Sequence, residues 1–109
     1  MGDWTEEIER EPRIYPPIHP GELLKEEFLD PMGITVYRLA KDIGVDRMRV
    51  HEIVHGKRRV SPDTALRLSR YFGMSDGYWI NAQSHYDLET AKMESGERIA
   101  REVMPLERA

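Results

Sequence analysis

Two short helical patterns lie almost end to end in the middle of this chain, and their spacing most restricts its fold. Thr35 is a helix-capping residue, and apolar residues follow it at positions 36, 39, 40 and 43 before Gly44. Asp46 can cap a second helix, whose apolar residues stand at positions 50, 53 and 54 before Gly56. Spacings of three and four residues predict amphipathic helices, and glycine commonly follows the last turn. Because only two residues separate the helices, they must form a tight hairpin.

Three further helical segments surround this pair. The first is predicted over 20–29, where residues 30–33 (Asp-Pro-Met-Gly) end it. The fourth opens at Ser61-Pro62, and the fifth is predicted over 76–93, capped by Ser75 and ended by Ser95-Gly96. No segment shows the alternation of a strand, so the sequence predicts an all-α domain of five helices. In the fourth helix we expect four residues to face inward: Ala65, Leu68, Ser69 and Phe72.

The two ends of the chain differ from this helical centre. Residues 1–17 hold three prolines among alternating charges without a period, which predicts an extended acidic arm. A length of 109 residues fits one compact domain, which we place at 18–95, with residues 96–109 as a C-terminal tail. No apolar run approaches the roughly 20 residues that cross a bilayer, and the acidic start is unlike a secretory signal. We therefore expect a cytoplasmic protein without a membrane partner.

Charge is unevenly distributed along the chain. Residues 1–30 hold three Lys/Arg and nine Asp/Glu, a net charge of −6, whereas residues 31–70 hold nine and four, a net charge of +5. Residues 71–109 hold four and seven, a net charge of −3. Because phosphate binding responds to the local field, the basic centre favours a nucleic-acid face despite the overall charge of −4.

Two short helices joined by a tight turn, the second with a polar face, form a helix-turn-helix unit, which places its second helix in the DNA major groove. Ala40 stands where the helices must approach closely, and Gly44 can take the positive φ of the turn. The predicted core of the unit is Leu39, Ala40, Ile43, Gly44, Val45, Val50 and Ile53. A five-helix order with this unit in second and third place resembles the Xre/Cro-type (lambda-repressor-like) family.

Flanking motifs make the resemblance more specific. Residues 18–22 (Ile-His-Pro-Gly-Glu), 56–59 (Gly-Lys-Arg-Arg), 61–68 (Ser-Pro-Asp-Thr-Ala-Leu-Arg-Leu) and 78–88, with Tyr-Trp-Ile-Asn-Ala-Gln and Tyr-Asp-Leu, are similar to HigA-type antitoxins. The likeness covers about residues 18–93. In the fifth helix that family more commonly has Phe before Trp, and Leu at positions 80 and 82.

The resemblance implies a bacterial, nucleoid-associated antitoxin that acts as a homodimer. Such a protein binds operator DNA, represses its own operon and neutralises a HigB/RelE-like RNase toxin. A stand-alone Xre-type transcriptional regulator without a toxin is the alternative. On the fifth helix, Trp79 and Tyr86 stand seven residues apart on one face, and we expect them to contribute core or dimer contacts.

Residues on the polar face of the second unit helix are the candidates for contact with DNA. Arginine can bond guanine with two hydrogen bonds, glutamate can accept from cytosine, and methionine can pack on a thymine methyl group. Cations in the following loop suit phosphates, which give affinity without sequence information. The predicted base-reading residues are Arg47, Met48, His51 and Glu52, and the predicted DNA-backbone residues are Arg38, Arg49, His55, Lys57, Arg58 and Arg59.

Residues 51–55 read His-Glu-Ile-Val-His, the H-E-x-x-H signature of zinc peptidases. A catalytic zinc needs a third protein ligand and a substrate cleft, and the extended motif would require Gly at position 58 and His at position 61. Arg58 and Ser61 stand there instead, so we interpret the motif as a chance pattern within a recognition helix. We predict no metal, no cofactor and no enzymatic activity; His19 is expected at a helix start and His85 on the surface or in packing.

The acidic N-terminal part suggests a surface for the toxin. An RNA-cleaving toxin should present a basic surface, and residues 1–30 carry the complementary charge. Trp4, Ile14 and Tyr15 would add apolar anchors to a segment that orders on binding. The alternative hypothesis is a solubilising tail that contacts nothing.

Overall fold

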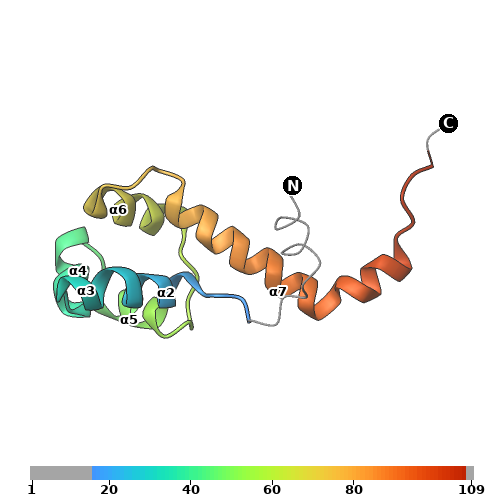
Figure 1. The fold of residues 1–109 in the computed structure, drawn as a ribbon. Helices are drawn as coiled ribbons and strands as arrows, with labels where there is room; N and C mark the ends of the chain where they lie inside the picture. The colour runs from blue at the N-terminus through green and yellow to red at the C-terminus, as the bar shows by residue number, and fades with distance from the viewer. Residues whose placement is uncertain (1–15, 108–109) are drawn as a thin grey trace, which may run out of the picture.

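The computed structural model describes residues 16–107, and every regular element in that range is helical (Figure 1). A first helix runs without interruption through α2, η1 and α3, and four more helices follow it. The predicted five-helix, all-α fold is therefore confirmed for the described residues. Residues 1–15 of the expected arm lie outside them. The elements are α2 (Pro20–Leu23), η1 (Leu24–Leu29), α3 (Asp30–Met32), α4 (Val36–Ile43), α5 (Arg47–Val54), α6 (Pro62–Phe72) and α7 (Tyr78–Glu102).

The first helix begins at a histidine cap and contains a wide turn. The backbone N–H of Gly21 donates to Nδ1 of His19 at 2.9 Å, so His19 is the helix-start residue that was predicted. The helix runs three residues past its predicted end at position 29, and Pro31, which was expected to help end it, lies inside the helix. A proline crowds the carbonyl four residues earlier, here that of Glu27 in the π-helical turn η1. Gly33, with φ of 66°, ends the helix.

Helices α4 and α5 form the predicted hairpin. Oγ1 of Thr35 accepts from the Arg38 N–H at 3.0 Å, and Gly44 turns the chain with φ of 76°. α5 begins directly after Asp46, as predicted, but the Asp46 side chain makes no capping hydrogen bond. The hairpin thus depends on a capped α4 and the glycine turn rather than on a cap at α5.

Helix α6 follows the prediction closely. Oγ of Ser61 accepts from the Thr64 N–H at 3.3 Å, and Pro62 occupies the first turn. Of the four residues expected inside, Phe72 is only half-buried and the other three are buried.

Helix α7 differs from its prediction at both ends. It begins at Tyr78 rather than at position 76, and its N-cap is Gly77, so Ser75 does not cap it. It also continues through Ser95-Gly96 to Glu102, because the residues around this pair favour a helix and Arg98 pairs with Glu102 at 3.8 Å. The helix changes direction in its last part (Figure 1).

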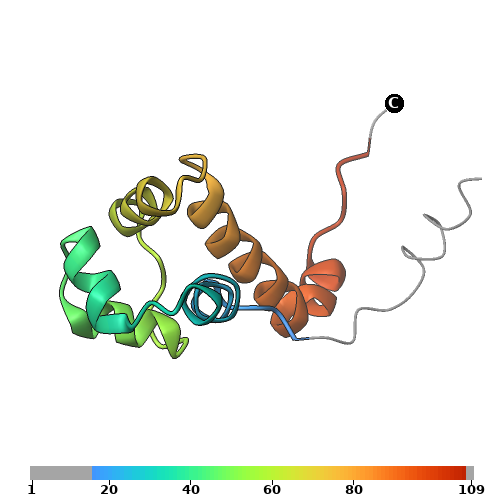
Figure 2. The ribbon, with the colours of Figure 1, turned by 60° about the vertical axis from the view of Figure 1, so that its left-hand side comes forward.

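Trp79 lies at the centre of the core. Its side chain is fully buried, and the Phe28 ring packs 5.1 Å from it, centroid to centroid. Of the two roles expected for Trp79, the core role is confirmed and the dimer role is wrong, since no part of the side chain reaches the surface. Tyr86, two turns further along α7, packs edge-on against the His19 ring, with 4.9 Å between the ring centroids. The second half of α7 extends away from α4 at the other end of the molecule (Figure 2).

The first helix meets α5 backbone to backbone at Gly21. A Cβ at this position would lie only 1.6 Å from the carbonyl oxygen of Ile53. A side chain therefore cannot be accommodated unless the two helices separate, which fixes the distance of α5 from the body of the domain.

We predict that Gly21→Ala destabilises the fold by about 3 kcal/mol or more, the upper range for overpacking, because backbone rather than a flexible side chain must move. Gly96→Ala is the matched control: the added Cβ meets nothing within 4 Å among the described residues. Inside a helix this change should stabilise by about 0.5 to 1 kcal/mol. Urea unfolding of the three proteins measures both effects. Equal midpoints for Gly21→Ala and wild type would refute the backbone contact.

Candidate nucleic-acid interface

Helix α5 has one buried face and one exposed polar face. Val50 and Ile53 are 2% and 1% exposed, and they seat α5 on the core. The other residues of the predicted unit core are placed consistently with this arrangement: Leu39, Ala40 and Ile43 are buried, Val45 is half-buried, and Gly44 forms the exposed turn.

Three of the four predicted base-reading residues lie together. Arg47, Met48 and His51 line one shallow hollow of about 280 Å³ at the start of α5. Val36 and Tyr37, from the first turn of α4, complete it. The Arg47 guanidinium lies 5.7 Å from the centre of the Tyr37 ring, a cation–π distance. The sequence analysis missed Tyr37, although an exposed aromatic residue two positions after the Thr35 cap is a signal that could have identified it.

The fourth predicted base-reading residue, Glu52, faces the following loop instead of this hollow. Its Oε1 accepts from Nε of Arg58 at 2.9 Å. The glutamate charge is therefore already compensated by a residue that was predicted to bind the DNA backbone.

The loop after α5 is anchored to α7. Gln83 is buried, and its Oε1 accepts from the Val60 N–H at 2.7 Å. Its Nε2 donates to Asp87 at 3.0 Å, and Arg59 pairs with the same carboxylate at 2.8 Å. Burial acts to raise the pKa of Asp87, but the hydrogen bonds from Arg59 and Gln83 outweigh it and hold the pKa below its usual value. The sequence analysis missed this anchor, because the partners lie 23 and 28 residues apart.

Among the remaining predicted backbone-binding residues, Arg38 pairs with Asp42 within α4 at 3.4 Å. Arg49 is half-buried and turns toward α6, where its Nη1 lies 3.8 Å from a carboxylate oxygen of Asp63. Within residues 16–107, no carboxylate pairs with Arg47 or Lys57. Among the described residues, the charges of these two exposed cations are therefore not compensated by a carboxylate.

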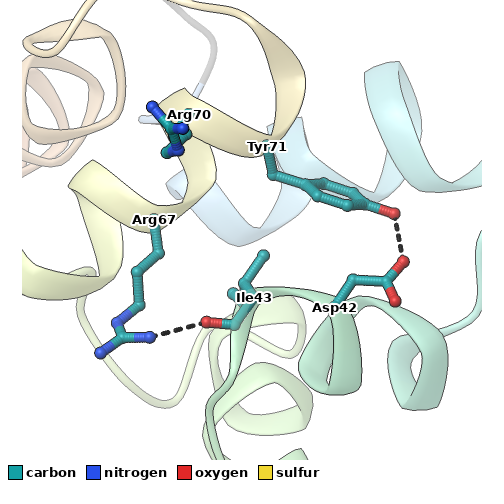
Figure 3. Close-up of a pocket in the computed structure, with 5 residues that line it drawn as sticks. All are labelled: Asp42, Ile43, Arg67, Arg70 and Tyr71. Atoms are coloured by element: carbon teal, nitrogen blue, oxygen red, sulfur yellow. Dashed lines mark hydrogen bonds between the residues drawn. The ribbon is translucent and has the colours of Figure 1, made fainter.

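A second hollow, of about 440 Å³, lies between α4 and α6 behind the turn (Figure 3). Nη1 of Arg67 donates to the Ile43 carbonyl at 2.8 Å, which satisfies a free carbonyl at the end of α4. The Tyr71 hydroxyl donates to Asp42, and this hydrogen bond is the main reason that the pKa of Asp42 is lowered. These contacts hold α4 against α6 and so fix the helix-turn-helix unit to the rest of the domain.

The H-E-x-x-H pair lies on the exposed side of α5, with the His51 and His55 ring centroids 4.2 Å apart. In the part of the chain that the structure describes, no group of three His, Asp or Glu side chains is placed to hold a metal ion. The ligand set of a zinc peptidase is therefore not assembled there. His85 is exposed on α7. No helix among residues 16–107 has the length and apolar character that crossing a bilayer requires.

Comparison with known proteins assigns the chain to a family. A helix-turn-helix family model matches residues 24–79. Virulence-associated protein I of Dichelobacter nodosus is 49% identical over 79 residues, which cover 72% of this chain and 73% of the relative. Antitoxin HigA-1 of Vibrio cholerae serotype O1 is 40% identical over 72 residues, which cover 66% and 68%.

Solved structures agree with these sequence matches. Pseudomonas aeruginosa antitoxin HigA, solved with the higBA promoter, is 44% identical with a TM-score of 0.81, and the match covers 84% of this chain and 99% of that one. A HigA-family addiction module antidote protein from Coxiella burnetii is 40% identical with a TM-score of 0.80, covering 84% and 100%. The chain is therefore an Xre-type helix-turn-helix protein that belongs to the HigA antitoxin family.

Proposed function

We propose that this chain binds operator DNA as a homodimer, represses its own operon and neutralises a HigB/RelE-like RNA-cleaving toxin. DNA binding is supported by the exposed polar face of α5, where Arg47, Met48 and His51 line one hollow. Lys57 is exposed in the loop after α5, and within residues 16–107 no carboxylate pairs with it. The solved HigA of Pseudomonas aeruginosa with promoter DNA also supports DNA binding, since that protein has the same fold.

In this proposal α5 enters the major groove and its two ends do different work. Arg47, Met48 and His51 contact base edges, while Lys57 and the neighbouring cations contact phosphates. Glu52 can reach a cytosine only when its ion pair with Arg58 opens. The remaining backbone contacts are assigned to Arg38, Arg49, His55, Arg58 and Arg59; of these, Arg49 is the most restricted, because it is held by α6.

Replacing Arg47 should reduce sequence preference, whereas replacing Lys57 should weaken binding to any duplex. We expect Arg47→Ala to cost about 1 to 3 kcal/mol on the operator and much less on random DNA. Lys57→Ala should weaken both and lower the slope of log K against log salt by about 0.9. Fluorescence anisotropy with both duplexes at several salt concentrations measures this.

Arg70→Ala is the matched control, because Arg70 is exposed on α6, outside the proposed DNA face and the proposed dimer surface, and its replacement should leave both affinities unchanged. The base-reading assignment is wrong if Arg47→Ala weakens operator and random duplex by the same factor.

The dimer surface is proposed to lie on the second half of α7 and the segment after it. A single recognition helix covers too few base pairs for selective repression, so two copies are needed. Exposed apolar side chains accumulate in this region, with charged residues interspersed among them. The exposed apolar residues are Leu88, Met93, Ile99, Val103, Met104 and Leu106. Such a concentration on a projecting helix is typical of an interaction surface.

The double variant Ile99→Glu/Val103→Glu should be monomeric, because two charges per chain would be buried without partners. Leu66→Glu is the control, since Leu66 is an exposed leucine on α6 and its replacement should leave the dimer intact. Sedimentation equilibrium gives the oligomeric state of each. A wild-type monomer at micromolar concentration, or a dimeric double variant, contradicts this surface.

The acidic N-terminal part is proposed as the toxin surface. Glu22, Glu26 and Glu27 are exposed on the first helix and continue the negative charge of residues 1–17. A nuclease that binds RNA carries complementary positive charge, and such complementarity speeds association and selects partners.

Deleting residues 1–17 should weaken binding to the toxin from the adjacent gene and leave operator affinity unchanged. The helix cap at His19 stays in the truncated chain, so the domain keeps its first helix. Surface plasmon resonance with toxin and with operator duplex separates the two effects. Unchanged toxin affinity would show that the arm is not a binding segment.

The genes beside this one test the alternative function. A chromosomal neighbourhood without any toxin gene would favour the stand-alone regulator.

A further inference from the structure

His51 and His55 form a close pair that base reading alone does not explain. Both side chains are exposed; His51 lies on α5, and His55, four residues on, is the residue that caps the end of this helix. Their ring centroids are 4.2 Å apart, with a 38° angle between the ring planes. Residues at this spacing lie one above the other on a helix, so two imidazoles can turn toward one point.

One hydrogen bond orients the second histidine for coordination. Nδ1 of His55 lies 2.8 Å from the backbone carbonyl oxygen of His51. Since a carbonyl oxygen can only accept, Nδ1 carries the proton and Nε2 keeps its lone pair. An imidazole that donates through one nitrogen to a backbone carbonyl and coordinates through the other is the usual arrangement of metal-binding histidines.

We propose that His51 and His55 chelate one divalent transition-metal ion, of the class that imidazole prefers, such as Zn²⁺ or Cu²⁺. The protein supplies two ligands and leaves the other positions to water, so this is a surface binding site and not the centre of a peptidase. α5 ends at Val54, and the negative end of the helix dipole lies beside the pair and favours a cation.

The charges around the pair are partly balanced. Arg58 is neutralised by Glu52 at 2.9 Å, and Arg47 lies over the Tyr37 ring. Arg59 pairs with Asp87 at 2.8 Å, and Arg49 lies 3.8 Å from Asp63. Arg47 still carries its charge, and within residues 16–107 no carboxylate pairs with it or with Lys57. Lys57 follows His55 by two residues, so Lys57→Ala should bind the metal more tightly than wild type does.

The site has a consequence for operator binding, and this consequence rests on the proposed function. An ion on His51 occupies the imidazole nitrogen that would contact a base edge, while its positive charge still attracts phosphate. Bound metal should therefore lower operator affinity about fivefold to hundredfold, the loss expected for one base contact, without lowering affinity for random duplex.

Isothermal titration of the full chain with ZnCl₂, in the absence of DNA, tests the site itself. Wild type should bind one Zn²⁺ per chain, and His51→Gln and His55→Gln should each lose this binding. His85→Gln is the matched control, because His85 is an exposed histidine on α7 and should keep it. Circular dichroism verifies that each variant is folded. Wild-type zinc binding in both α5 variants, or its loss in His85→Gln, overturns the proposal.

Anisotropy with operator and random duplex, with and without ZnCl₂, tests the consequence. Zinc should reduce the preference of wild type for the operator and leave that of His55→Gln unchanged. If zinc binds but the preference stays the same, the link to DNA reading is wrong. If the chain shows no operator preference without metal, the proposed function fails, whereas the titration without DNA still decides the metal site.

Discussion

The close approach of Gly21 to the Ile53 carbonyl sets where α5 sits, and the presentation of its polar face depends on it. A helix that reads bases must keep its position to within a fraction of a hydrogen-bond length. Backbone contact from the first helix, the small Ala40 of α4 and the Arg67 hydrogen bond to the end of α4 all restrict the same unit.

Helix α7 links the proposed DNA and dimer surfaces physically. Trp79 in its first turn fills the core, and Gln83 in its second turn holds the loop that carries Lys57. The same helix then projects from the domain with its exposed apolar residues. In the proposed dimer, α7 therefore sets the spacing between the two recognition helices, since the same helix anchors the proposed phosphate-binding loop and carries the proposed dimer contact. The ion pair of Arg59 with Asp87 adds to this link.

Local signals in the sequence predicted the helices well, because caps and glycine turns act within a few residues. Thr35, Gly44 and Ser61 behave as expected. The errors arise where tertiary partners or neighbouring propensity decide the outcome: Asp46 follows the turn without capping, and α7 continues through Ser95-Gly96 instead of ending there. The candidate site was predicted as a set of residues on one helix face. Arg38 and Asp42 stand four residues apart on α4, so their pairing follows from local spacing. The pairing of Arg49, Arg58 and Arg59 could not be predicted, since their carboxylate partners lie on other elements.

Nuclear magnetic resonance of the full chain with operator DNA tests the central claim that α5 is the reading element. Backbone amide shifts should change most in α5, in the first turn of α4 at Tyr37 and in the loop 56–59, with much smaller changes in α6. Random duplex should affect the loop but not the start of α5 to the same extent. Changes centred on the α4–α6 hollow, with the amides of Arg47 to His51 unmoved, would contradict the account.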